Sequence, residues 1–233
     1  MEFKMKALKY VLITPILAAA FSSQAAYLDL RGAYATEAKQ WEHRARAGLD
    51  FADAWQVHLE GTQGHGKDLF SDKTQSVSAF ETEVNYNYKS ANNLTWSPGF
   101  VYWAGRDHVE YRPYLKLTWS PGPYYIAGRY RYQSATGDAN NTNQFDAWFG
   151  YAFEAVSLEY NPAYIARDDV SFKNDGSLKD NKWEHTFQAK YTGFETWSPY
   201  LEFQLLDNIN KGTASAPDVT EEKRWRFGVT WVF

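Results

Sequence analysis

The sequence contains no cysteine, which excludes disulfides, thiolate nucleophiles and zinc sites built on cysteine pairs. It also contains no apolar run of about 18 or more residues, the length that a membrane-spanning helix requires. Basic residues do not predominate, because the formal net charge is -4, and this argues against nucleic acid as a partner. These absences exclude redox proteins of the Cys-X-X-Cys type, helical membrane proteins and general nucleic-acid binders.

Aromatic residues are abundant in this otherwise polar chain. They make up 18% of its 233 residues, with 10 Trp, 17 Tyr and 15 Phe. Disordered chains are poor in aromatic residues, so a folded protein is expected. A polar, cysteine-free chain this rich in aromatics is typical of a β-barrel in the bacterial outer membrane.

The N-terminus has the three parts of a secretory signal peptide. Three lysines precede an apolar stretch at residues 10–21, and small residues follow at Ser23 and Ala25. The stretch is too short for a membrane anchor, because a helix needs about 20 residues to cross the bilayer. We therefore predict a signal peptide at 1–25 and the barrel at 26–233. Removal of three Lys and one Glu leaves 21 basic and 27 acidic residues, a net charge near -6.

Apolar and polar residues alternate in the rest of the chain, in runs of about ten residues. This is the length of a tilted transmembrane strand. Long and short connections between the runs also alternate, as outer loops and periplasmic turns do in bacterial barrels. The pattern predicts an all-β protein, a 12-stranded antiparallel transmembrane barrel with periplasmic termini. The expected strands are 27–35, 41–51, 55–62, 79–88, 94–103, 110–119, 124–133, 144–153, 155–165, 182–191, 196–206 and 223–233.

The even-numbered strands begin and end with an aromatic residue on the outward face. Aromatic side chains at both membrane interfaces are a feature of such barrels, whereas a soluble β-sandwich has no need of them. The terminal Phe233 is the kind of residue that the outer-membrane assembly machinery recognises, so we expect this machinery and the outer-membrane lipid bilayer as partners. The predicted girdle residues are Trp41, Phe80, Tyr111, Phe145, Trp183 and Trp225 at one interface and Phe51, Tyr88, Trp119, Phe153, Tyr191 and Phe233 at the other.

The same alternation assigns most mid-strand charges to the lumen, because a lipid-facing Arg costs about 2–4 kcal/mol at the bilayer midplane. The first, second and last strands meet where the barrel closes, and the sixth and seventh lie opposite. Inward cations on these strands predict basic ladders on two facing walls, which suit acidic solutes because Arg binds carboxylates through paired hydrogen bonds. The candidate substrate-track residues are Arg44, Arg46, Arg112, Lys116, Arg129, Arg131, Arg224 and Arg226.

Inward carboxylates leave a second interpretation open. In it, the lumen cations and carboxylates neutralise each other and stiffen the wall. The inward acidic residues are Asp29, Glu42, Glu60, Glu81, Glu83, Asp146, Glu159, Glu184 and Glu202. Twelve tilted strands give a backbone radius of about 12 Å, wide enough for a narrow channel that passes one extended oligosaccharide or a small acid.

Four short motifs, in order along the chain, resemble the oligogalacturonate-specific porin family. They are Tyr111-Arg112-Pro113-Tyr114-Leu115, Gly128-Arg129-Tyr130-Arg131-Tyr132, Trp197-Ser198-Pro199-Tyr200-Leu201-Glu202 and Arg224-Trp225-Arg226-Phe227-Gly228-Val229. The resemblance covers essentially the whole mature chain. It implies a monomeric, twelve-stranded channel of the bacterial cell outer membrane for passive uptake of acidic oligosaccharides or sugar acids such as oligogalacturonates, with Arg112, Arg129, Arg131, Arg224 and Arg226 on its basic track.

Two other functions remain as alternatives, a structural or adhesive outer-membrane barrel and an outer-membrane enzyme. An enzyme would need clustered His, Asp or Ser at one rim. The best dyad is Asp107-His108, which has no nucleophile beside it, so no catalytic residue is assigned. The loop with Asp168, Asp169 and Asp175 lacks the regular ligand spacing of a calcium loop. We expect no metal site and no cofactor.

Overall fold

The computed structural model describes residues 25–52, 54–65, 76–105, 108–137, 141–167, 181–207 and 221–233. Among these residues, no helix has the length and apolar character needed to cross a membrane. Residues 1–24 of the predicted signal peptide and the aspartate-rich loop after residue 167 lie outside the described residues. Cleavage after Ala25 therefore stays a prediction.

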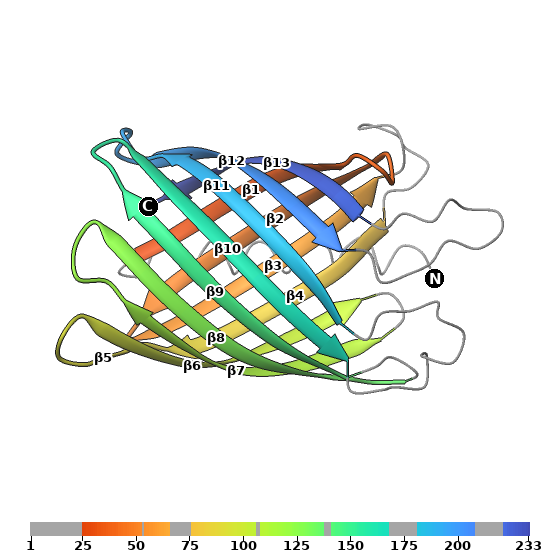
Figure 1. The fold of residues 1–233 in the computed structure, drawn as a ribbon, viewed down its shortest axis with the longest axis horizontal. Helices are drawn as coiled ribbons and strands as arrows, with labels where there is room; N and C mark the ends of the chain where they lie inside the picture. The colour runs from red at the N-terminus through yellow and green to blue at the C-terminus, as the bar shows by residue number, and fades with distance from the viewer. Residues whose placement is uncertain are drawn as a thin grey trace, which may run out of the picture.

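All of the regular structure in the described chain is β-strand (Figure 1). The strands run obliquely around one barrel, and the C-terminus lies at the end where the connections are short (Figure 1). They are β1 (Ala25–Ala35), β2 (Gln40–Phe51), β3 (Trp55–His65), β4 (Ser76–Tyr86), β5 (Tyr88–Lys89), β6 (Leu94–Gly105), β7 (Val109–Trp119), β8 (Tyr124–Ala135), β9 (Thr142–Ala152), β10 (Val156–Arg167), β11 (Asn181–Tyr191), β12 (Trp197–Asp207) and β13 (Glu221–Val232).

The barrel is closed, antiparallel and twelve-stranded, as predicted. Each strand pairs with its neighbours in the chain, and β1 pairs with β13 to complete the ring. The thirteen labels arise because the predicted strand 79–88 is interrupted at Asn87, so β4 and β5 both pair with β6. Several strands also extend about two residues further toward the long-connection end than predicted, as β6 and β8 do.

The outward face is apolar and aromatic, as the alternation predicts. Phe145 is 52% exposed and Phe233 is 60% exposed in the isolated chain, where lipid would cover them. The predicted girdle residues are all exposed in this sense except Trp41, which is half-buried. Trp41 packs on Tyr34 and Phe227, with ring centroids 4.8 and 6.1 Å apart. Aromatic rings therefore face outward at both ends of the barrel.

The seam between β1 and β13 is fastened at both ends. At the short-turn end, the Phe233 amide donates to the carbonyl of Ala26 over 2.9 Å. At the other end, the carboxylate of Glu222 accepts hydrogen bonds from the backbone amides of Glu37 and Ala38, at 3.1 and 3.0 Å. These contacts tie the first hairpin turn to the last strand. The pairing of β1 with β13 itself leaves the ring without a free edge.

Candidate functional site

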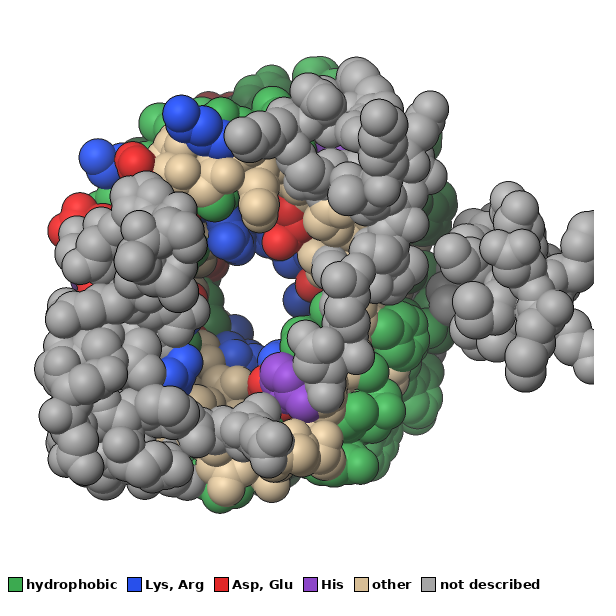
Figure 2. Space-filling model, turned by 90° about the vertical axis from the view of Figure 1, so that its right-hand side faces the viewer, with side chains coloured by type: hydrophobic (Ala, Val, Ile, Leu, Met, Phe, Trp, Pro, Cys, Tyr) green, Lys and Arg blue, Asp and Glu red, His purple; other side chains and the backbone are tan. Residues whose placement is uncertain are grey.

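An opening runs through the barrel when it is viewed along its length, and charged side chains line it (Figure 2). Lys and Arg side chains border the opening above and below in this view, while hydrophobic side chains cover the outer wall (Figure 2). The order of strands places β7 and β8 across the ring from β1 and β13. The predicted cations therefore stand on two facing walls of one lumen.

Arginines on the β1–β2–β13 wall lie close to carboxylates. Arg44 contacts Asp29 at 2.5 Å and Glu60 at 3.4 Å. Arg46 contacts Glu83 at 2.7 Å, and it also lies 2.7 Å from the Nδ1 atom of His58. On this wall, Arg226 Nη1 lies 3.5 Å from Glu202, and Arg31 Nη1 lies 3.8 Å from the same carboxylate.

The β7–β8 wall combines cations with both carboxylates and aromatic rings. Arg112 binds Glu110 at 2.7 Å and Glu81 at 3.0 Å, and its guanidinium lies 5.0 Å from the Trp103 ring centroid. Arg129 binds Asp146 at 2.8 Å. Its guanidinium also lies 5.4 Å from the Tyr114 ring and 5.2 Å from the Trp148 ring. Cation–π contacts of this kind contribute about 0.5–2 kcal/mol each.

Ion pairs neutralise the lumen cations only in part. Five of the eight candidate track residues form ion pairs, namely Arg44, Arg46, Arg112, Arg129 and Arg226. Within the described part of the chain, the other three have no carboxylate within 4.0 Å. Of these three, Arg131 donates to the amide oxygen of Gln144 at 2.6 Å, and Lys116 lies over the Trp148 ring. The third is Arg224, whose neighbours across the sheet are Gln204 and Ala35.

Tyrosine rings lie flat on the lumen wall, each across a glycine of the neighbouring strand. The Tyr114 ring covers Gly99 on β6, and its hydroxyl donates to Glu83 on β4 at 2.6 Å. A side chain at Gly99 would overlap this ring. Tyr200 covers Gly228 in the same way and donates to Asp29 at 3.0 Å. The rings thus stay out of the opening and hold wall carboxylates in place.

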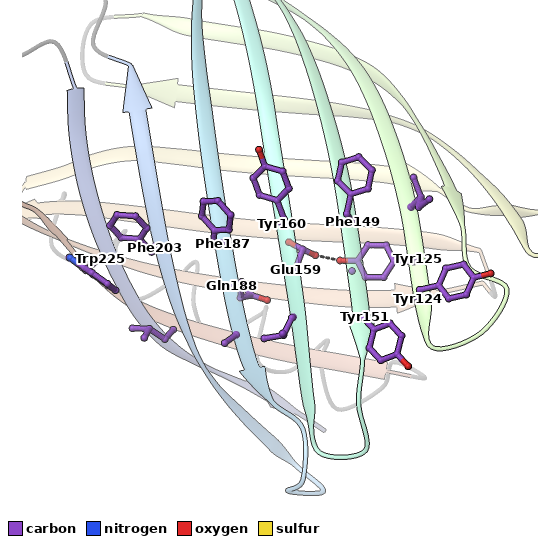
Figure 3. A pocket seen from close by; sticks show the side chains of 15 residues that line it. Tyr124, Tyr125, Phe149, Tyr151, Glu159, Tyr160, Phe187, Gln188, Phe203 and Trp225 are labelled. Atoms are coloured by element: carbon purple, nitrogen blue, oxygen red, sulfur yellow. Dashed lines mark hydrogen bonds between the residues drawn. The ribbon is translucent and has the colours of Figure 1, made fainter.

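Tyr125 repeats this arrangement over Gly150, and its hydroxyl donates to Glu159 (Figure 3). Figure 3 also shows neighbouring aromatic side chains of β9–β13, among them Phe149, Phe187 and Trp225. These outward rings surround a shallow apolar hollow on the lipid-facing wall. The hollow is distinct in character from the polar lumen.

The histidines form no rim cluster in the described part of the chain. His185 stacks on Tyr160 and Trp183 on the outer wall, and His58 belongs to the Arg46–Glu83 network. His108 binds Glu110 at 2.9 Å, while Asp107 lies outside the described residues. Among the described residues, no group of three or more His, Asp or Glu could hold a metal ion.

Sequence reasoning missed two features of the lumen. It gave no role to the glycines of the lumen wall, among them Gly99, Gly150 and Gly228. The glycines matter because each stands directly opposite a tyrosine, as Gly99 does with Tyr114, and that pairing depends on strand register. A signal was present, since Gly and Tyr recur at inward positions of adjacent strands. The second feature is the contact of cations with Trp103 and Trp148.

The chain resembles known porins over most of its length. A family model described as "Oligogalacturonate-specific porin protein (KdgM)" matches residues 19–233. The N-acetylneuraminic acid outer membrane channel protein NanC of Escherichia coli K12 is 26% identical over 96% of this chain and 98% of its own. The oligogalacturonate-specific porin KdgM of Dickeya dadantii is 24% identical over 68% of this chain and 69% of its own.

Solved structures agree on the fold. The NanC porin superposes with a TM-score of 0.73 at 21% identity, covering 88% of this chain and 98% of that one. The KdgM porin has a TM-score of 0.66 at 20% identity, covering 89% and 99%. The family model spans the whole described barrel. The chain therefore belongs to the oligogalacturonate-specific porin family and is a β-barrel of the bacterial outer membrane.

Proposed function

We propose that the protein is a passive, monomeric channel that admits acidic oligosaccharides or sugar acids, preferring anions over cations. The observation that carries the proposal is the placement of cations on two facing walls of an open lumen (Figure 2). A carboxylated sugar moving between these walls would exchange one charge-assisted hydrogen bond for the next. Each such bond contributes about 1.5–3 kcal/mol, which allows binding and also release.

The names of two relatives support the substrate class, because one is a channel for N-acetylneuraminic acid and the other is specific for oligogalacturonate. Both names describe acidic sugars. The proposed track consists of Arg44, Arg46, Arg112, Lys116, Arg129, Arg131, Arg224 and Arg226.

Ion pairing on the walls is compatible with this function. A guanidinium has five N–H donors, so an arginine that binds one carboxylate of the wall can still donate to a passing carboxylate. Arg46, for instance, contacts Glu83 and Glu60 and still lines a lumen cavity. We propose that the wall carboxylates orient the arginines and lower their affinity for a solute carboxylate, so that solutes are released as readily as they bind.

The decisive experiment is reconstitution in planar bilayers with a panel of matched sugars. Oligogalacturonates, N-acetylneuraminic acid and neutral galactose oligomers of similar length would be added on one side. We expect concentration-dependent interruption of the chloride current by the acidic sugars and a weaker effect of the neutral ones. Equal effects, or none with any acidic sugar, would contradict the proposal. A barrel that conducts no ions would instead favour the structural or adhesive alternative.

A further inference from the structure

A cavity of about 670 Å³ opens into the lumen near the short-turn end of the barrel. It lies between the wall of β2–β6 and the wall of β7–β9, and residues of both line it. Charged, amide and aromatic side chains all line it. Lys116 and Trp148 line one side, and the side-chain amides of Gln56, Asn85 and Asn87 line the other.

Lys116 reaches this cavity without a carboxylate partner. The sheet register places Ala127 of β8 between the two strands concerned, directly opposite Trp148 of β9. This small side chain leaves room for the indole to reach across β8 toward β7. There the Lys116 ammonium lies 4.3 Å from the centroid of the indole ring. In the described part of the chain, no carboxylate lies within 4.0 Å of that ammonium.

Lys116 differs from several arginines of the lumen because no carboxylate of the wall neutralises it. Arg44, Arg46 and Arg129 each form an ion pair with a wall carboxylate, at distances of 2.5–2.8 Å. An aromatic face attracts a cation through its quadrupole but brings no opposite charge. Trp148 therefore fixes the position of Lys116 without neutralising it, so the positive charge and the N–H groups that point away from the ring stay available to an anion.

The facing amides form a continuous hydrogen-bonded chain. Gln56 donates to Asp50 at 2.9 Å, and Asn85 donates to Gln56 at 3.2 Å and to Asn87 at 3.0 Å. Ser97 donates to the same Asn87 oxygen at 2.6 Å. Among the described residues, Asn87 Nδ2 has no hydrogen-bond acceptor. Amides that both donate and accept suit hydroxyl groups, which do the same.

We propose that this cavity is a subsite for one sugar-acid unit, whose carboxylate binds Lys116 and whose hydroxyl groups bind the amide chain of Gln56, Asn85 and Asn87. Trp148 is a positioning residue that holds Lys116 against the β7–β9 wall. The subsite rests on the proposed transport of acidic sugars. It adds a place where the channel distinguishes a sugar acid from a simple anion such as chloride, because chloride has no hydroxyl groups to offer.

The test compares two lysines of the lumen. Lys116→Gln removes the proposed carboxylate ligand, while Lys190→Gln removes the same charge outside the cavity, where Lys190 donates to Thr230 at 3.2 Å. The measured quantity is the concentration of trigalacturonate that halves the single-channel current. We expect Lys116→Gln to raise this concentration about tenfold, the effect of losing one charge-assisted hydrogen bond, and Lys190→Gln to change it less than about twofold. Both variants should lower chloride preference to a similar extent.

Substitutions at Trp148 test the positioning role. Trp148→Leu should weaken block by trigalacturonate, and Trp148→Phe should restore most of it, because a phenyl ring still offers an aromatic face to Lys116. Block by neutral galactotriose should be the same in the unmodified protein and in both Trp148 variants. A merely structural indole would affect the acidic and neutral sugars alike. Because Arg129 also lies 5.2 Å from this ring, Trp148→Leu is repeated in Lys116→Gln, where it should cause no further loss of trigalacturonate block if the indole acts through Lys116.

The outcomes separate the subsite from the function on which it rests. Equal effects of Lys116→Gln and Lys190→Gln would overturn the subsite and leave the channel proposal intact. Equal loss of acidic and neutral block in Trp148→Leu would overturn the positioning role. Absence of any trigalacturonate block in the unmodified protein would overturn the proposed function, and the subsite with it.

Discussion

The hydroxyl of Tyr114 donates a 2.6 Å hydrogen bond to Oε1 of Glu83, although strand β6 stands between these two residues. The ring can cross that strand because Gly99 has no side chain to block it. Glu83 also forms an ion pair with Arg46 of β2, so this carboxylate connects two residues, Tyr114 on β7 and Arg46, that are separated by strands β3, β4 and β6. A glycine in the sheet thus determines where a charge of the lumen stands.

Substitution of this glycine should narrow the channel. In Gly99→Ala, the new methyl group overlaps the Tyr114 ring, which must turn toward the lumen and give up its bond to Glu83. We expect a lower single-channel conductance and a free energy of unfolding reduced by about 1–3 kcal/mol, the cost of an unsatisfied buried group. Gly61→Ala is the matched control, because nothing lies within 4 Å of a Cβ there. Unchanged conductance in Gly99→Ala would refute the wall-lying role of Tyr114.

Phe233 should be needed for efficient assembly. It closes the aromatic girdle at the short-turn end, and it is the terminal residue on which recognition by the assembly machinery is predicted to depend. Deletion of Phe233 should lower the amount of heat-modifiable barrel recovered from outer membranes. Phe153→Asp is the control, because it removes an aromatic residue of the same girdle while keeping the C-terminus. If both variants lower the recovery of heat-modifiable barrel to the same extent, the aromatic girdle matters and the terminal position does not. Normal recovery after deletion of Phe233 would contradict the prediction.

Chloride should be preferred over potassium, and the preference should depend on ionic strength. Salt screens the lumen charges, and the Debye length falls from about 10 Å at 0.1 M to about 3 Å at 1 M. Reversal potentials across a salt gradient should therefore show strong anion preference at low salt that fades near 1 M. Cation preference at every concentration would mean that the inward carboxylates outweigh the arginines.

Substitution of Arg129 and Arg131 should distinguish a role in transport from a role in bracing the wall. Both stand inward on β8, but Arg129 binds the buried Asp146, whereas Arg131 binds the neutral Gln144. Arg129→Ala with Arg131→Ala should lower anion selectivity and uptake of acidic oligosaccharides while leaving the barrel folded. Loss of Arg129 also strands a buried carboxylate, so Asp146→Asn is added to keep the wall neutral. Unchanged selectivity with a lower melting temperature would support bracing alone.

Much of the architecture could be predicted because each strand has one face toward lipid and one toward water. That contrast imposes a period of two, which sets the number of strands, their faces and the girdles. The interruption at Asn87 was not predictable from alternation, because Asn87 keeps the inward position that the pattern assigns to it. The extension of β6 to Gly105 was missed because its last residues continue the strand beyond the outer girdle.

Pairing within the lumen was only partly predictable. Arg129 and Asp146 stand directly opposite each other, and a register inferred from the turn between β8 and β9 could have paired them. Arg46 and Glu83 are separated by strand β3, so side-chain length and direction decide whether they meet. The contact between Lys116 and Trp148 likewise crosses a strand. Such contacts depend on coordinates in three dimensions and have no signature in the order of residues.

The fastening of β1 to β13 has a consequence for biogenesis. The contacts between Glu222 and the turn after β1 join residues 184 and 185 positions apart in the chain, and Phe233 meets Ala26 at the other end. Until the last strand has been made, β1 and β12 each expose a row of unpaired amides and carbonyls, which cannot be left bare in hydrocarbon. A chain truncated before β13 would thus be open at two edges, and such edges are prone to pair with other chains. Closure of the barrel therefore requires its first and last strands together.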